Sequence, residues 1–233
     1  MLELKNLVVG YGRQKTVLHD VNLTFPDGQM AVVMGHNGAG KTTLLNAVFG
    51  LLPPERGEIL ADGQPLRSGP EERVRRRMAY SPAGQAVFPG LSVGENLDIA
   101  AAVTRTAAQD VRQRKQAVFG LFPVLAERLR VRAGALSGGQ RRMLALGMTL
   151  MQDPRVLLLD EPSLGLSPLM VEELYGAITR IRDEFGLTVI AVEQSINPTI
   201  LQADKLHILR MGRVVLSGAS DILSDPQRLW TLL

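Results

Sequence analysis

Residues 30–42, MAVVMGHNGAGKT, decide the fold of this 233-residue chain. The stretch begins with an apolar run, Met30–Met34, which is typical of a strand, and continues as a loop that contains three glycines. Residues 42–49 then have the character of a short helix, which Gly50 ends. The sequence therefore predicts a strand, a glycine-rich loop and a helix in direct succession.

The glycine-rich loop fits a phosphate-binding pattern, which is a glycine, four residues of any kind and then Gly-Lys-Thr. Glycines allow backbone N–H groups to converge on phosphates, and the N-terminus of the following helix adds partial positive charge. Lys41 is expected to bridge the β- and γ-phosphates of a nucleotide, and the Thr42 hydroxyl to bind Mg²⁺. The predicted nucleotide-binding residues of this loop are Gly35, His36, Asn37, Gly38, Ala39, Gly40, Lys41, Thr42 and Thr43.

Two adjacent carboxylates follow a second apolar run. Val156–Leu159 has the pattern of a strand covered on both faces, and Asp160 and Glu161 come directly after it. Such a pair by itself is typical of a surface loop, but in a chain with a phosphate loop it indicates a nucleotide site. Asp160 is predicted to hold Mg²⁺ through water, and Glu161 to orient or deprotonate the attacking water.

The order of the remaining elements predicts one α/β domain. The first sixty residues have the pattern of a mixed sheet that carries one helix, and residues 92–152 have a helical pattern. Ser167 and Pro168 then begin a helix, which precedes the apolar run Leu187–Val192. A strand, a helix and a strand in this order imply a right-handed crossover in an α/β core. The expected division is a single domain, 1–233, with a core of residues 1–83 and 153–233 and a helical insertion over about 84–152.

A helix start at residues 137–140, SGGQ, has two interpretations that involve the same atoms. Ser137 and Gln140 fit a capping box, in which each side chain binds the backbone N–H of the other residue. The same helix N-terminus, with the bare backbones of Gly138 and Gly139, also offers a second surface for an anion. Because this start is far from the phosphate loop in the sequence, it is suited to a nucleotide bound to another subunit.

Composition limits the class of protein. Hydrophobic residues make up 45% of the chain and charged residues 21%, as in globular proteins, and no apolar run approaches the roughly 18 residues that span a bilayer. The absence of cysteine excludes disulfides and cysteine-bound metals, and the formal net charge of +3 requires no nucleic-acid partner. No secretory signal precedes the first strand, so we expect folding in the cytoplasm. The densest basic run is expected to be a solvated helix face and consists of Arg73, Arg75, Arg76 and Arg77.

The pentapeptide LSGGQ, residues 136–140, in a chain with this phosphate loop and acidic strand end, resembles the signature of ABC-type ATPases. The resemblance covers essentially the whole chain. It implies an α/β fold of the P-loop NTPase type, with a RecA-like core, an N-terminal antiparallel β subdomain and a helical insertion. It also implies that two ATPase domains pack head to tail, and that each ATP lies between the phosphate loop of one domain and the signature of the other.

The same resemblance assigns further binding residues. Ser137 and Gly139 would contact the γ-phosphate of an ATP held by the partner domain, and Gly138 and Gln140 belong to the same signature. Tyr11 matches the aromatic residue that stacks on adenine, although core or rim packing is its alternative role.

Four segments resemble one subfamily more closely, the ATP-binding subunits of branched-chain amino acid importers. They are LFPVLAERL (121–129), RAGALSGGQRRMLALG (132–147), LLLDEPSLGLSPL (157–169) and VEQS (192–195). This likeness implies an ATP-hydrolysing subunit, peripheral on the cytoplasmic face of the inner membrane, beneath separate permease subunits that an external solute-binding protein supplies. A heterodimer with a sister ATPase is implied, and a homodimer is the alternative. Relatives in the same group import urea and short amides, which is the alternative substrate class.

Three positions depart from the general ABC pattern, and the third, Ser167, is sufficiently explained by its role as the N-cap of the helix that it begins. Ala83 occupies the place of a glutamine that normally touches Mg²⁺ and the permease, and Gln85, two residues on, is the candidate metal ligand that would replace it. Gln194 occupies the switch position that is usually histidine, and its amide can donate to a γ-phosphate but cannot titrate near neutral pH. Catalysis is therefore assigned to Glu161 and Gln194, with Glu161 acting on water. Ala83 also motivates an alternative function, a nucleotide sensor of low turnover.

Overall fold

The computed structural model describes residues 1–12, 15–67, 69–84, 86–103, 108–195 and 202–219. The strands are β1 (Leu2–Gly10), β2 (Thr16–Phe25), β3 (Met30–Met34), β4 (Arg56–Ala61), β5 (Gln64–Pro65), β6 (Met78–Ser81), β7 (Val156–Asp160), β8 (Thr188–Glu193), β9 (Lys205–Arg210) and β10 (Arg213–Ala219). The helices are α1 (Lys41–Phe49), α2 (Pro70–Arg75), α3 (Val93–Ala102), α4 (Ala108–Leu121), α5 (Pro123–Glu127), α6 (Gly138–Leu150) and α7 (Pro168–Phe185), with a 3₁₀ turn at Ala133–Ala135.

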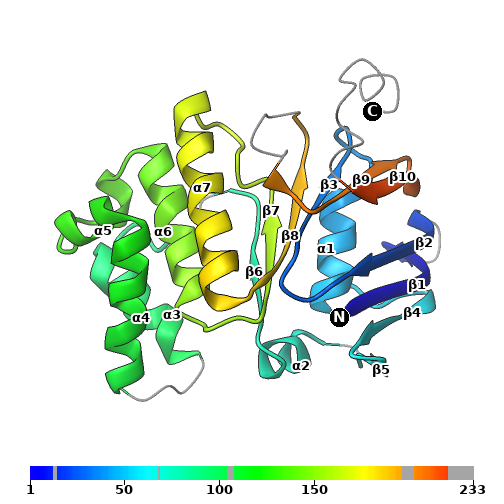
Figure 1. Cartoon of the computed structure of the whole chain (residues 1–233), viewed down its shortest axis with the longest axis horizontal. Coiled ribbons are helices and arrows are strands. Elements are labelled where there is room, and N and C mark those ends of the chain that lie inside the picture. Colours follow the sequence, from blue (N-terminus) through cyan, green and yellow to red (C-terminus); the bar gives the residue numbers. More distant parts are fainter. Residues whose placement is uncertain (13–14, 68, 85, 104–107, 196–201, 220–233) are drawn as a thin grey trace.

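The strands form two sheets (Figure 1). An antiparallel sheet has the order β2-β1-β4-β5, and a second sheet has the order β10-β9-β3-β8-β7-β6, in which β10 alone is antiparallel to its neighbour. The expected antiparallel β subdomain is confirmed. The expectation that one mixed sheet takes all the early strands is wrong, because β3 lies in the middle of the second sheet. All five residues of β3 are buried, so it needs cover on both faces, whereas β1 and β2 alternate buried and exposed side chains.

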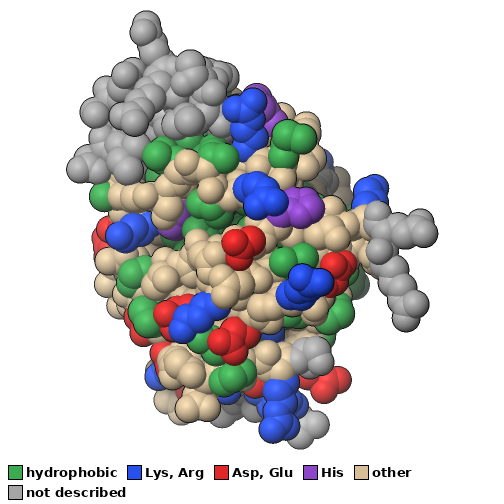
Figure 2. Space-filling model, turned by 90° about the vertical axis from the view of Figure 1, so that its right-hand side faces the viewer, with side chains coloured by type: hydrophobic (Ala, Val, Ile, Leu, Met, Phe, Trp, Pro, Cys, Tyr) green, Lys and Arg blue, Asp and Glu red, His purple; other side chains and the backbone are tan. Residues whose placement is uncertain are grey.

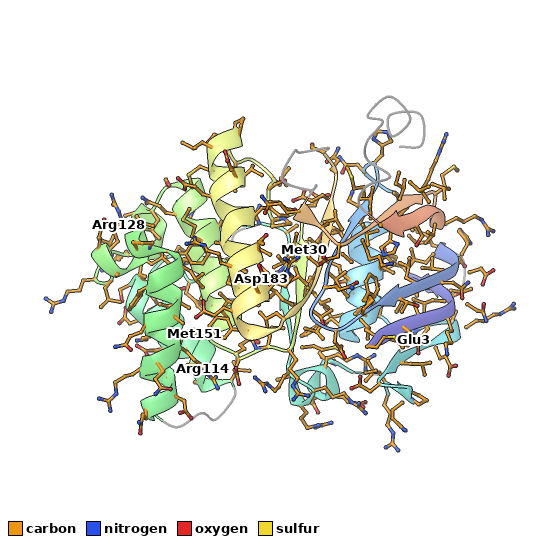
Figure 3. The ribbon with its side chains drawn as sticks, viewed as in Figure 1. Glu3, Met30, Arg114, Arg128, Met151 and Asp183 are labelled. Carbon is orange, nitrogen blue, oxygen red and sulfur yellow. The ribbon has the colours of Figure 1, made fainter. Side chains whose placement is uncertain are left out.

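The central sheet separates two layers of hydrophobic core. Leu157 and Leu159 of β7 pack with α6 and α7 on one face, and Leu158 packs with α1 on the other. Figure 3 shows Met30 of β3 near the centre of the molecule, where it is fully buried, and Arg128 on the outer side of the helical part. The helices α3 to α6 gather on the side of the central sheet away from the antiparallel sheet (Figure 1), and the described residues between 92 and 152 contain no strand, as predicted.

Parallel pairing brings the ends of distant segments together. The strands β3, β6, β7 and β8 run in the same direction, so the residues that follow their carboxyl ends meet at one edge of the sheet. These ends carry the phosphate loop after Met34, the two carboxylates at Asp160 and Glu161, and Gln194, the predicted switch residue. The fold therefore brings the predicted nucleotide residues of three separate segments to one edge.

The surface on the side of the antiparallel sheet carries side chains of both charges (Figure 2). Figure 2 shows basic and acidic side chains interspersed with hydrophobic ones on the side of the molecule that carries the antiparallel sheet. No helix in the described ranges combines the length and the apolar character needed to cross a bilayer.

Arg73 corrects the prediction that the arginine run is a solvated helix face. The Arg73 side chain is only 2% exposed, and it donates hydrogen bonds from Nε to the Val48 carbonyl at 2.9 Å and from Nη1 to the Arg67 carbonyl. Its neighbours Arg75, Arg76 and Arg77 are exposed, as expected. Burial of Arg73 lowers the pKa of its guanidinium. The arginine connects α2 to the end of α1, a contact that the charge pattern could not indicate.

Arg73→Met should destabilise the chain because it leaves two carbonyl acceptors beside α1 without their donor. We expect the free energy of unfolding to fall by about 2 to 4 kcal/mol, measured by urea denaturation. Arg75→Met, on the exposed face of the same helix, is the matched control and should change the value by less than about 0.5 kcal/mol. Equal denaturation midpoints for the two variants would contradict this role.

Candidate active site

The phosphate loop between β3 and α1 depends on glycine at three positions. A Cβ atom on Gly35 would lie 2.3 Å from the carbonyl oxygen of Leu209 in β9, so the loop fits against that strand only without a side chain. Gly38 and Gly40 have φ angles of 81° and 107°, in the region where glycine is favoured. Gly40 is the N-cap of α1, and no side chain among the described residues caps it. The first N–H groups of α1 therefore remain available to an anion.

Lys41 is the first residue of α1, and its side chain turns back to the phosphate loop. Its side chain is 4% exposed, and Nζ donates to the carbonyl oxygens of Gly35 at 2.8 Å and His36 at 3.2 Å. The same Nζ lies 3.3 Å from Oε1 of Glu161, which is 15% exposed. Residues 36–38 at the tip of the loop are exposed. The structure thus brings the predicted phosphate-binding lysine and the predicted catalytic carboxylate into one ion pair.

Asp160 joins the carboxyl end of β7 to the start of α1. The Thr42 hydroxyl donates to Oδ1 of Asp160 at 3.2 Å, and the Tyr80 hydroxyl of β6 donates to Oδ2 at 3.1 Å. Burial raises the pKa of the Asp160 carboxyl above its usual value, and the two hydrogen bonds act in the opposite direction. Burial and the charge of Asp160 also raise the pKa of Tyr80, which keeps its hydroxyl a donor. Tyr80 was not predicted from the sequence, because a tyrosine in a short strand gives no signal of its partner.

Glu161 turns the chain sharply after β7. Its φ angle is 47°, a left-handed conformation that non-glycine residues rarely adopt and that costs of order 1 kcal/mol. The backbone N–H of Glu161 donates to the Val192 carbonyl of β8 at 3.0 Å, which holds the turn against the sheet. The carboxylate consequently points back to Lys41 rather than continuing the alternation of the strand.

A buried carboxylate, Glu193, connects the phosphate loop to the segment after Glu161. The Glu193 side chain accepts hydrogen bonds from the Ser163 N–H at 3.0 Å, the Ser163 hydroxyl at 2.8 Å and the Tyr175 hydroxyl at 2.8 Å. Its backbone carbonyl accepts from the Gly35 N–H at 3.2 Å. Burial raises the pKa of Glu193, and the hydrogen bonds from Tyr175 and Ser163 partly offset that effect. Glu193 enters the sequence-based prediction only as part of VEQS, although an acid that ends a fully buried strand is a signal that could have identified it.

Gln194, the predicted switch residue, lies at the edge of the same site. Together with Glu161, Glu193 and Ser163 it lines a pocket of about 350 Å³, to which Leu164 and Leu166 also contribute. Gln194 is half-buried, so its amide reaches the pocket from the carboxyl end of β8. The pocket lies against the predicted catalytic carboxylate of Glu161 and has room for water and part of a phosphate group.

The signature, residues 137–140, lies on a different layer from the phosphate loop. The capping box is present, with the Ser137 hydroxyl accepting from the Gln140 N–H at 3.2 Å and the Gln140 side chain accepting from the Ser137 N–H at 3.1 Å. This signature begins α6, whereas the phosphate loop begins α1, and these two helices pack on opposite faces of the central sheet. No hydrogen bond or ion pair in the described ranges joins the signature to the phosphate loop.

The predicted adenine-stacking residue and the predicted substitute metal ligand lie in two further segments. Tyr11 is 51% exposed, and its hydroxyl lies 3.4 Å from the Thr43 hydroxyl at the start of α1. Its ring is therefore beside the nucleotide loop and is not part of the core. Ala83 is exposed in the loop after β6, and Gln85, the predicted substitute ligand, lies outside the described residues.

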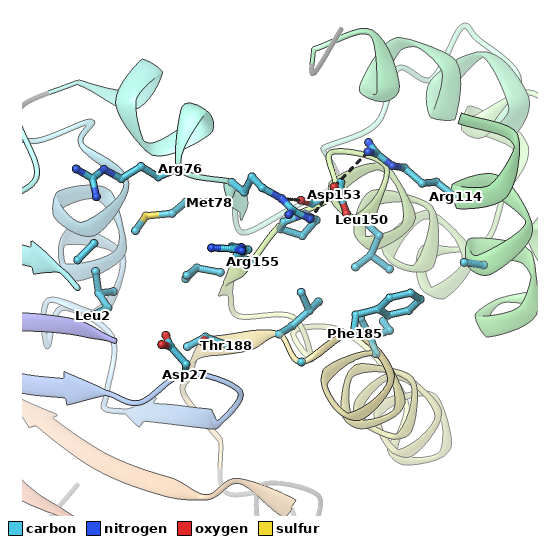
Figure 4. A pocket seen from close by; sticks show the side chains of 18 of the residues that line it. Leu2, Asp27, Arg76, Met78, Arg114, Leu150, Asp153, Arg155, Phe185 and Thr188 are labelled. Atoms are coloured by element: carbon cyan, nitrogen blue, oxygen red, sulfur yellow. Dashed lines mark hydrogen bonds and ion pairs between the residues drawn. The ribbon is translucent and has the colours of Figure 1, made fainter. Parts of the chain in front are cut away.

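A second, separate cleft of about 690 Å³ lies at the amino-terminal ends of β7 and β8 (Figure 4). Its lining includes Arg155, Phe185 and Asp153, and the carboxylate of Asp153 pairs with Arg77 at 2.6 Å and Arg114 at 3.2 Å. The phosphate loop lies at the carboxyl end of its strand, so this cleft is not part of the candidate active site.

A glycine loop at a strand end, a lysine within it and adjacent carboxylates on the neighbouring strand define a nucleotide-binding protein of the phosphate-loop class. The chain matches the model of the ABC transporter family over residues 18–164, and it belongs to that family. It is the ATPase subunit of an ABC transporter, in which ATP hydrolysis is coupled to transport.

Three similar proteins illustrate the likeness. The high-affinity branched-chain amino acid transport ATP-binding protein BraG of Pseudomonas aeruginosa is 39% identical, over 97% of each chain. The probable branched-chain amino acid transport ATP-binding protein LivF of Archaeoglobus fulgidus is 35% identical, over 98% of this chain and 96% of its own. The solved structure of cbiO1 from Clostridium perfringens, part of the ABC transporter complex cbiONQ, has a TM-score of 0.88 and 25% identity, covering 99% of this chain and 93% of its own.

Tyr175→Phe should lower the thermal stability of the chain because it removes one of the hydrogen-bond donors to the buried Glu193 carboxylate. We expect the free energy of unfolding to fall by about 2 kcal/mol. For a chain of this size, that change lowers the melting temperature by about 4 to 8 °C in differential scanning calorimetry. Tyr11→Phe removes a hydroxyl at an exposed position and should change the melting temperature by less than about 2 °C. A melting temperature unchanged by Tyr175→Phe would show that Glu193 does not depend on this donor.

Proposed function

We propose that this ATPase subunit energises the uptake of branched-chain amino acids through separate permease subunits. The observation that carries the proposal is the convergence of the Lys41 loop and the Asp160–Glu161 strand end on one edge of the central sheet, with Lys41 and Glu161 3.3 Å apart. The likeness to BraG and LivF over nearly the whole chain supports the choice of branched-chain amino acids.

The phosphate loop is proposed to bind the phosphates of ATP. The unfilled N–H groups at the start of α1 and the buried Lys41 ammonium supply positive charge on the same side of the loop. Lys41 now shares its charge with Glu161 and two carbonyls, and it is suited to exchange these partners for the β- and γ-phosphates. Tyr11 lies next to Thr43 and is proposed to stack on the adenine ring.

Mg²⁺ is proposed to bind beside this loop, at Thr42 and Asp160. The donor set fits, because a hydroxyl and a carboxylate oxygen 3.2 Å apart are the hard ligands that Mg²⁺ takes alongside substrate phosphates. No group of three or more His, Cys, Asp or Glu in the described ranges offers an all-protein cage, and Mg²⁺ in nucleotide sites does not require one. A bound Mg²⁺ would offset the negative charge of the β- and γ-phosphates. Tyr80 would hold Asp160 in place for it.

Glu161 is proposed to orient and deprotonate the attacking water. Its carboxylate leaves the strand direction at a left-handed residue and lies beside the 350 Å³ pocket that Gln194 also lines. The Gln194 amide can donate to the γ-phosphate, but it cannot accept a proton near neutral pH. The base role therefore belongs to Glu161.

The signature at 137–140 is proposed to serve the ATP of a second ATPase subunit, a sister chain or a second copy. Two facts support this. The capping box satisfies the local hydrogen bonds of Ser137 and leaves the start of α6 exposed, and α6 and α1 occupy opposite faces of the sheet. A head-to-tail pair places each signature opposite the partner's phosphate loop.

We propose that residues 1–233 form one domain with an insertion at about 84–152. The subunit is proposed to be peripheral on the cytoplasmic face of the membrane. It would lie beneath permease subunits that an external solute-binding protein supplies.

Glu161→Gln should reduce hydrolysis and leave ATP binding intact because it removes a base but keeps the size of the side chain. We expect kcat for phosphate release to fall by roughly 10² to 10⁴-fold, the range for loss of a general base. Glu172→Gln, at an exposed position of α7, is the charge-matched control.

Lys41→Ala should abolish binding of a fluorescent ATP analogue, and retained binding would contradict the phosphate-loop assignment.

Uptake measurements test the transported solute. In cells that carry the complete transport system, Lys41→Ala should abolish accumulation of radiolabelled leucine and isoleucine, because the permease then has no source of energy. Radiolabelled urea in the same cells is the comparison. Loss of urea uptake with unchanged leucine uptake would replace the proposed substrate class.

A further inference from the structure

Arg142, in the first turns of α6, is a buried cation that the ATPase site described above does not use. Its side chain is 8% exposed. Nη1 donates to the carbonyl oxygen of Gly84 at 2.7 Å, and Nη2 donates to the carbonyl oxygen of Leu164 at 3.2 Å. One guanidinium group thus connects the signature helix to the loop after β6 and to the loop after the catalytic Glu161.

The charge environment of Arg142 is unusual. In the described part of the chain no carboxylate forms an ion pair with it within 4.0 Å, although Glu193, Asp160 and Glu161 act on it from a distance. Burial lowers the pKa of Arg142, and the fields of these three carboxylates partly offset that effect. A buried arginine without a direct counter-ion is costly. Among the described residues, two backbone carbonyls bind this cation directly, and the carboxylates of the candidate active site compensate it from a distance.

The contact of Arg142 with Leu164 is reinforced at the signature itself. A Cβ atom on Gly139 would lie 2.4 Å from Cε of Met170 in α7, so the signature backbone packs closely against the start of that helix. Leu164 lies between Glu161 and α7, in the segment that Glu193 holds through Ser163. The start of α6 and the catalytic loop consequently form one packed unit, with the guanidinium at its centre.

We propose that Arg142 is a positioning residue that couples the two nucleotide sites of the assembled pair. The inference rests on the proposed head-to-tail arrangement, in which the signature serves the partner's ATP and Glu161 serves the chain's own ATP. When the signature engages the partner's γ-phosphate, Arg142 carries the displacement of α6 to the Leu164 carbonyl, and through this loop to Glu161. Its bond to Gly84 extends the same link to the loop after β6.

The hydrogen bonds of the neighbouring Arg141 differ from those of Arg142. Arg141 Nη1 donates to the Leu136 carbonyl, and its remaining contact, 3.5 Å to the Gly134 carbonyl, belongs to the same local segment. Arg141 therefore stabilises the turn that precedes the signature, whereas Arg142 reaches 22 and 58 residues along the chain. Only the second arginine connects separate functional segments.

The experiment measures steady-state ATPase rates of the full-length assembled protein over a titration of Mg-ATP, for wild type, Arg142→Gln, Arg142→Lys and the charge control Arg130→Gln at an exposed site. For Arg142→Gln we expect kcat to fall about tenfold and the cooperative dependence on ATP to become hyperbolic. The Kd for Mg-ADP should stay within about twofold of wild type, because the Lys41 loop is untouched. Arg142→Lys, which keeps the charge and one donor at a time, should recover part of the cooperativity.

The outcomes separate the possible roles. Wild-type kcat and cooperativity in Arg142→Gln would overturn the proposal, and so would a wild-type dependence on ATP that is already hyperbolic. Melting temperatures are measured for every variant. If Arg142→Gln loses activity only in proportion to its loss of folded protein, and the rate per folded molecule keeps its cooperativity, Arg142 is merely structural and the proposal fails. A wild-type rate no higher than that of Glu161→Gln would refute the proposed function instead, and with it the premise of this inference.

Discussion

The buried carboxylate of Glu193 is the interaction on which the geometry of the site depends. It is 2% exposed and lies at the end of β8, where its carbonyl receives the first N–H of the phosphate loop and its side chain receives three donors from Ser163 and Tyr175. A buried acid must be hydrogen-bonded, so these partners cannot move independently without exposing an unsatisfied carboxylate. The requirement fixes the phosphate loop and the segment after Glu161 relative to the same strand.

That fixed frame allows Glu161 to adopt a strained backbone. A left-handed residue persists only where its surroundings determine the conformation, and here β8 holds the Glu161 N–H while Glu193 holds Ser163, two residues later. The turn directs the Glu161 carboxylate to Lys41. The proposed base, Glu161, thus adopts a conformation whose energetic cost the sheet offsets through hydrogen bonds to neighbouring backbone groups.

Much of the site was predictable because its chemistry resides in short contiguous motifs. The residues from Gly35 to Thr42 and the pair Asp160–Glu161 needed only pattern and element order, and the structure brings both motifs to one edge of the sheet. Supporting residues such as Tyr80 were missed because their partners lie 80 residues away, as with Asp160. Arg73 was assigned to solvent because a charge run shows no burial, and only packing against the end of α1 reveals its place.

The sequence by itself determined which residues form the candidate nucleotide site, through a glycine-rich loop after one apolar strand and two carboxylates at the end of another. It also determined the capping box at Ser137, because such a box is local to four residues. Only the tertiary structure decided that the signature and the phosphate loop begin helices on opposite faces of the sheet, and that Arg142 bridges two distant loops. The physical reason is that strand order and burial are properties of long-range packing, which period and propensity within a window do not encode.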